Sequence, residues 1–127
     1  MENGAIGNDQ ITVSSKDTDT QSAEPSTCCQ PGYARLNYNS RWKPSKSQVA
    51  ANRWIQIDLR ATKRVTGVIT QGWSSWVKTL YVLYENPAGS GQMKYIKNDD
   101  GSDKVCSILQ YNCSVQYPKH IPFFFLN

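Results

Sequence analysis

Side chains suited to nucleophilic or metal chemistry are few and scattered in this chain of 127 residues. The only histidine, His120, stands between Lys119 and Ile121, and no local motif pairs it with any of the four cysteines. A cysteine nucleophile needs a base within hydrogen-bond reach, and structural zinc sites use closely spaced ligand pairs that this sequence lacks. The sequence therefore predicts no catalytic residues, no metal site and no cofactor, and we expect that the protein is not an enzyme.

Tryptophans predict a binding surface instead. Trp73 and Trp76 flank Ser74 and Ser75 in a short tip, where burying both indoles at once is difficult. An indole combines a large apolar ring with one N–H donor, which suits an interface that is wet on one side. We expect this tip to contact a ligand. The alternative is that Trp76 begins the next strand and packs inward.

Basic side chains are concentrated in the middle of the chain. The net charge is +4, but residues 1–30 carry −4 and residues 31–78 carry +8. Such a segment attracts anionic head groups, sulfated glycans or nucleic acid, and a solvated surface is the alternative. The bases are spread over loops and a predicted hairpin, without stacking aromatics interleaved along one groove, so nucleic acid is not the expected partner.

Short strands separated by turn-rich segments must position these side chains. Residues 54–59 alternate between apolar and polar side chains, which is the period of a strand with one buried face. Residues 65–72 are rich in β-branched side chains, and the charged connection 60–64 predicts an antiparallel pair between the two segments. The pattern as a whole predicts an all-β fold, an antiparallel β-sandwich.

Further strands are predicted at residues 11–15, 76–84 and 92–97, with loops at 16–32 and 38–53. The side chains that we expect in one shared core are Ile55, Ile57, Leu59, Val68 and Leu83.

Five segments, in this order, resemble landmarks of the discoidin domain, also called the coagulation factor 5/8 type C domain. They are residues 1–6, 11–15, 34–37, 54–72 and 76–84. The resemblance covers about residues 1–105 and implies a β-sandwich, or distorted jelly-roll barrel, whose loops at one end bind ligands. It also implies that the tip at residues 73–76 is one of the projecting loops.

The same resemblance places the 38–53 loop at the same end of the domain. This loop would contribute Val49, Arg53, Lys43 and Lys46 to the ligand-binding surface, and bases beside apolar tips favour anionic head groups. Membrane-binding members of the family carry bulky apolar residues in the first loop, whereas residues 16–21 are polar and partly acidic. That difference favours a glycan or a protein ligand.

The resemblance ends near residue 105. We expect an incomplete discoidin-like domain at residues 1–105, missing its usual last strands, and a divergent tail at residues 106–127. A sandwich without its last strands exposes sheet edges and core. The apolar run 123–126 then either covers part of that gap or forms an aggregation-prone end.

The four cysteines suggest disulfides and an oxidising compartment. Cys106 and Cys113 are a candidate local disulfide. Adjacent Cys28 and Cys29 rarely bond to each other, so one or both should pair elsewhere or stay free. Asn112 begins an Asn-Cys-Ser tripeptide and is a candidate N-glycosylation site.

We therefore expect an extracellular recognition and adhesion module, secreted or at the cell surface, within a longer chain. No signal peptide precedes residues 1–6, and no apolar run approaches the roughly 18 residues that span a bilayer. The expected partners are a cell-surface glycan, an extracellular-matrix protein or an anionic phospholipid membrane. The alternatives are a non-functional or unstable truncated product and a nucleic-acid-binding domain.

Overall fold

The structure is a computed structural model that describes residues 5–17, 29–65, 68–71, 77–85, 90–107, 112–113 and 119–126. Its strands are β1 (Ile11–Val13), β2 (Ile55–Val65), β3 (Val68–Ile69), β4 (Thr79–Glu85), β5 (Met93–Tyr95), β6 (Val105–Ser107), β7 (Asn112–Cys113) and β8 (Lys119–Leu126), and its 3-10 helices are η1 (Asn8–Gln10), η2 (Pro31–Tyr33) and η3 (Ala50–Asn52). Within these residues there is no α-helix. The predicted all-β fold is confirmed.

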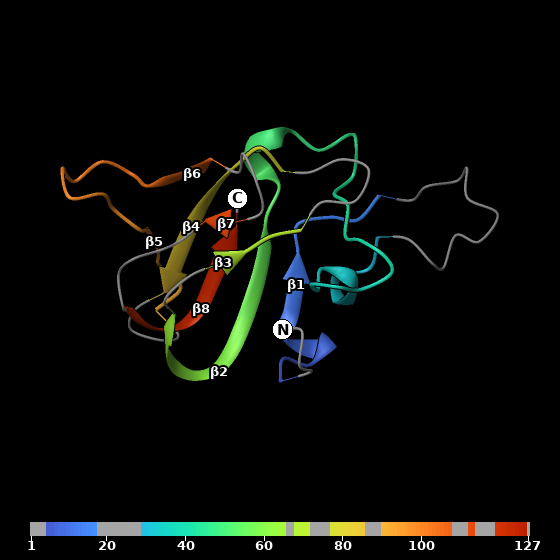
Figure 1. Ribbon diagram of the computed structural model, residues 1–127, viewed down its shortest axis with the longest axis horizontal. Coiled ribbons are helices and arrows are strands. Elements are labelled where there is room, and N and C mark those ends of the chain that lie inside the picture. The colour runs from blue at the N-terminus through green and yellow to red at the C-terminus, as the bar shows by residue number, and fades with distance from the viewer. Residues whose placement is uncertain are drawn as a thin grey trace.

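All strand pairs are antiparallel and form two sheets (Figure 1). The larger sheet has the order β1-β2-β8-β4-β5, with β6 paired to β4, and the smaller one pairs β3 with β7. The strands predicted at residues 11–15, 76–84 and 92–97 are present in shortened form, as β1, β4 and β5. Residues far apart in the chain therefore meet in one sheet.

The sequence pattern did not predict the position of β8 at the centre of the larger sheet. Phe124 lies opposite Ile57 of β2 and opposite Tyr84 of β4, so β8 joins two strands that do not pair with each other. The backbone of residues 124–126 is thus paired on both sides, and that of Phe123 is paired with β2. The sequence left open whether the apolar run 123–126 covers part of the gap or forms an aggregation-prone end. The structure shows it as a strand inside the larger sheet. The boundary at residue 105 stays a prediction.

The predicted antiparallel pair between residues 54–59 and 65–72 is wrong. Strand β2 continues through the charged segment to Val65, both of its ends pair with β8, and β3 pairs with β7. The register of β2 against β8 shifts between Asp58 and Lys63, and only Pro122 of β8 stands against these intervening residues. Proline has no N–H to donate to a ladder, so a bulge here replaces the expected turn.

The core lies between the two sheets. One cluster of buried side chains consists of Val68, Leu80, Val82, Ile96 and Cys106. Ile55 and Ile57, on β2, are also buried. The side chains of β4 alternate between the two faces of the sheet, and Leu80 and Val82 point into the core. Leu83 therefore lies on the other face, where it is half-buried and is the register partner of Tyr95. The prediction for Leu83 is therefore wrong, and Leu59 is only half-buried.

We expect that replacing Ile57 by Ala destabilises the fold by about 2–5 kcal/mol, because the side chain is 1% exposed and its removal leaves a cavity. Chemical denaturation measures the change. Replacing exposed Ile69 by Ala is the matched control and should change stability little. A cost below about 0.5 kcal/mol for Ile57→Ala would contradict its place in the core.

Candidate functional site

The loop at residues 38–53 is fixed to the end of β1 by one glutamine. Ser14 Oγ donates to Gln48 Oε1 at 3.0 Å, and Ser15 Oγ donates to the same oxygen. The backbone carbonyl of Gln48 accepts from Arg53 Nε at 2.9 Å. We call the surface formed by residues 38–53 the loop end. Gln48 holds the backbone of this loop in place, and the 3-10 helix η3 is the only regular element within residues 38–53.

Two tryptophans complete this attachment. Trp54 exchanges hydrogen bonds with Ser14: its N–H donates to Ser14 Oγ, and its carbonyl accepts from the Ser14 N–H, both at 3.0 Å. Trp42 Nε1 donates to the backbone carbonyl of Ser15 at 2.9 Å. Both indoles are half-buried, so each satisfies a structural role at the edge of the sandwich. A polar loop with its hydrogen bonds satisfied in this way is pre-organised for binding.

Lys43 is held by an ion pair within the protein. Its Nζ lies 2.8 Å from Oδ2 of Asp17, and the Asp17 N–H donates to the Lys43 carbonyl at 2.8 Å. The side chain of Asp17 is only 10% exposed. The Lys43 ammonium lowers the pKa of the Asp17 carboxyl, and this outweighs the opposing effect of burial. Lys43 therefore links the first loop to the second and is less available to a ligand than the sequence suggested.

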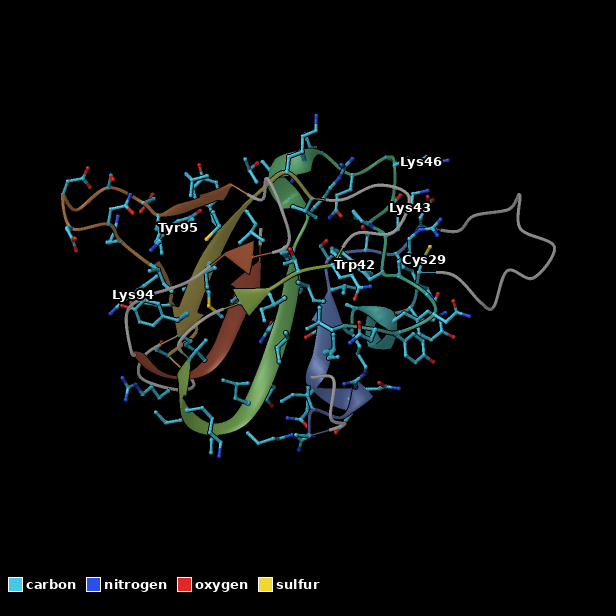
Figure 2. The ribbon with its side chains drawn as sticks, viewed as in Figure 1. Cys29, Trp42, Lys43, Lys46, Lys94 and Tyr95 are labelled. Carbon is cyan, nitrogen blue, oxygen red and sulfur yellow. The ribbon has the colours of Figure 1, made fainter. Side chains whose placement is uncertain are left out.

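Val49 and Lys46 are the exposed members of the predicted set. Val49, directly before η3, is 68% exposed, and Lys46 is exposed on the same loop. Arg53 is half-buried behind them, where it holds the Gln48 carbonyl. Figure 2 shows Lys46 and Lys43 at one end of the molecule, with Trp42 beneath them. The structure thus offers an exposed apolar side chain and an exposed base on one fixed loop.

The predicted tip of Trp73, Ser74, Ser75 and Trp76 lies outside the described residues. Its ligand contact stays a prediction. The chain that enters it is described as far as Gln71, whose Oε1 accepts from the Asn37 N–H at 2.7 Å. Leu36 and Ile69 line a shallow hollow beside this hydrogen bond. The tip therefore begins next to an open, partly apolar surface.

Sequence reasoning did not identify the residues that position the loop end. Ser14, Ser15, Asp17 and Gln48 act through hydrogen bonds and one ion pair between segments far apart in the chain. The only available signal was the change from apolar to polar residues directly after β1. That change indicates a strand end and does not reveal the partner.

Cys29 and Cys106 are both disulfide-bonded, so Cys29 does not stay free, while Cys28 lies outside the described residues. Cys106 packs against Val68 in the core cluster, and Val68 is the register partner of Cys113. Asn112 is the partner of Ile69, which is 60% exposed. The register is compatible with a bridge from Cys106 to Cys113 and with glycosylation of Asn112, and both stay predictions.

No three metal-ligating side chains cluster in the described part of the chain. The same residues include no helix with the length and apolar character needed to cross a bilayer.

We expect the Asp17–Lys43 ion pair to stabilise the protein in a pH-dependent way. The folded-state pKa of Asp17 is lowered, so its contribution is complete above the ordinary aspartate pKa of about 4 and is lost as the pH falls through the lowered value. The melting temperatures of the wild type and of Asp17→Asn should differ by a constant amount above about pH 5 and converge below about pH 4. A difference that stays constant as the pH is lowered well below 4 would contradict the ion pair.

We also expect peptide mapping under non-reducing conditions to recover Cys106 and Cys113 in one disulfide-linked pair. We expect this pair because the two cysteines are close in the chain and both are neighbours of Val68, Cys106 in the core cluster and Cys113 in the β3–β7 register. A linkage of Cys106 to Cys29 would contradict this pairing.

Comparison with known proteins agrees with this architecture. The F5/8 type C domain model matches residues 10–112, so the match extends somewhat beyond residue 105. Coagulation factor VIII of Sus scrofa is 38% identical over 110 residues, which are 83% of this chain and 5% of that protein. Coagulation factor V of Pseudonaja textilis is 42% identical over 86 residues, or 65% of this chain and 5% of the relative.

Neuropilin-1 of Gallus gallus is 42% identical over 73 residues, which are 57% of this chain and 7% of the relative. The chain thus spans a small part of each of these relatives. The extent of the family match, together with the antiparallel two-sheet fold, shows that the chain belongs to the F5/8 type C, or discoidin, domain family.

Proposed function

We infer that this domain is a non-catalytic extracellular recognition module that binds its ligand through the loop end. The ligand classes are a cell-surface glycan, an extracellular-matrix protein and an anionic phospholipid membrane. The observation that carries the proposal is Val49, which is 68% exposed on a loop held by the Gln48 hydrogen bonds. An apolar side chain kept in water on a fixed loop has a favourable free energy to gain from a partner.

The charges beside Val49 favour an anionic partner. Lys46 is exposed near it, and a base next to an apolar tip is the arrangement that anionic membranes attract. Lys43 contributes less than expected, because Asp17 neutralises it. The polar character of residues 16–17 adds no second apolar anchor. One anchor and one base give weak membrane affinity, so a glycan or a matrix protein is the preferred ligand.

The experiment compares single variants of the loop end and of the tip. Val49→Ala, Lys46→Gln and Trp73→Ala are tested for binding to glycan arrays, to matrix proteins and to vesicles with and without phosphatidylserine. We expect at least one of these ligands to bind the wild type, with a loss of about tenfold in affinity for Trp73→Ala, as for an aromatic anchor. Thermal stability should change little.

Val105→Ala is the matched control for Val49→Ala, because Val105 is a 45% exposed valine on β6 that belongs neither to the loop end nor to the predicted tip. Adding salt should release an anionic ligand that is held by Lys46, whereas salt-insensitive binding would favour a neutral sugar or an apolar protein surface. If Trp73→Ala lowers the melting temperature strongly and leaves binding intact, Trp73 belongs to the core. The absence of any cooperative melt would sink the proposal altogether.

A further inference from the structure

The shallow hollow beside the start of the tip has the composition of a small binding site. It has a volume of about 370 Å³ and is lined by Leu36, Asn37, Ile69, Thr70 and Gln71. Sites for small molecules commonly occupy about 300–1,000 Å³ and combine apolar walls with a few polar groups. In this hollow two aliphatic side chains stand beside two amides and one hydroxyl.

One hydrogen bond holds the two walls of the hollow together. The Asn37 N–H donates to Gln71 Oε1 at 2.7 Å, and these residues are 34 positions apart in the chain. Asn37 has φ +56°, in the left-handed region that asparagine tolerates better than most residues. The walls are therefore in place before a ligand binds, which lowers the entropy that binding costs.

The same hydrogen bond leaves Gln71 with a donor group for a ligand. A backbone N–H requires an acceptor, so the amide oxygen of Gln71 faces Asn37 and its NH₂ group does not take part in that bond. Gln71 is exposed, and among the described residues none accepts a hydrogen bond from this NH₂ group. The Thr70 hydroxyl likewise makes no hydrogen bond with the part of the chain that the structure describes.

Apolar surface lies directly beside these polar groups. Ile69 is 60% exposed and Leu36 is half-buried. Tyr38, which follows Asn37 in the chain, is 46% exposed although its ring stacks on that of Tyr33, with 5.2 Å between the ring centroids. The surface thus suits a ligand that presents both C–H groups and hydroxyl groups.

We propose that this hollow binds one neutral sugar unit of a glycan. The inference rests on the proposed function, because it gives the preferred glycan ligand a site next to the loop end, whose first residue is Tyr38. A sugar ring would present hydroxyl groups to Gln71 and Thr70 and C–H groups to Ile69. None of the lining side chains is charged, so the hollow supplies no base to hold a sulfate or a carboxylate.

The probes are the methyl glycosides of mannose, galactose and N-acetylglucosamine, each titrated into the full 127-residue chain and followed by NMR chemical shifts. We expect at least one of them to bind saturably. Gln71→Glu keeps the oxygen that accepts from the Asn37 N–H but removes the NH₂ donor. This variant should bind the glycoside about fivefold more weakly, on the scale of one hydrogen bond, with little change in melting temperature.

Gln92→Glu is the matched control, because it makes the same change of charge at an exposed glutamine outside the hollow and should bind like the wild type. Two more variants keep the proposal testable if Gln71→Glu is unstable. Thr70→Val removes the hydroxyl, and Ile69→Ala removes an exposed apolar wall, and each should weaken binding about fivefold. A wild type that binds none of the three glycosides, or three hollow variants that bind like the wild type, would overturn the proposal.

Further arms separate the hollow from the loop end and from other ligands. Glycoside binding that is lost in Lys46→Gln but retained in Gln71→Glu would place the sugar at the loop end and reject the hollow. Methyl glucuronide, which carries a carboxylate, should bind no more tightly than the neutral glycosides, and tighter binding would contradict a neutral site.

The outcome for the hollow is distinguishable from that for the proposed function. Matrix proteins or vesicles that bind through Val49 while no glycoside binds would reject the hollow and leave the proposed function standing. Glycoside binding that Gln71→Glu weakens supports the hollow, even if no variant of the loop end changes the binding of any ligand.

Discussion

The rest of the structure depends on the hydrogen-bonded ladder that β8 forms with its two neighbours. Strands β2 and β4 do not pair with each other, and Phe124 stands between Ile57 and Tyr84 with its backbone in both ladders. Removing β8 would leave two open edges with unpaired N–H and C=O groups and would uncouple β1 and β2 from the core cluster. The loop end is fixed to β1 and to the start of β2, so its position relative to the core also depends on this ladder.

The loop end shows how an irregular segment is held in place by polar contacts. Gln48 accepts hydrogen bonds from two serines at the end of β1. Trp42 extends the same network by donating to the Ser15 carbonyl, and the Trp54 N–H donates to the Ser14 hydroxyl. Because these donors and acceptors satisfy one another, few of them remain for a ligand. The residues therefore divide into two groups. Asp17, Lys43 and Arg53 hold the loop, whereas Val49 and Lys46 stay accessible to a partner.

Local sequence patterns predicted the strands that neighbouring residues determine. They failed where the structure of a segment depends on pairing with a strand far away in the chain. Alternation identified the first half of β2, because buried Ile55 and Ile57 alternate with polar residues next to them in the sequence. The charged residues 60–64 resemble a turn, and only Pro122, far along the chain, reveals that they form a bulge in a continuing strand. The choice between Val82 and Leu83 for the core likewise depends on register with neighbouring strands. Among the site residues, the exposure of Val49 and Lys46 could be predicted from their position in a loop. The ion pair that neutralises Lys43 could not be predicted, because the sequence does not show that Asp17 lies beside it.

The order of the strands along the chain has a consequence for how the domain folds. Leu126 pairs with Ile55 and with Val82, so the central ladder closes between residues that are very distant in sequence. Closing such long loops costs chain entropy before any contact compensates for it, and folds dominated by distant pairings fold slowly. During synthesis, β2 and β4 emerge from the ribosome well before the strand that joins them. Until β8 has been made, the edges of β2 and β4 are open to other chains, so the growing domain is exposed to chaperones and to misassembly during the last part of its synthesis.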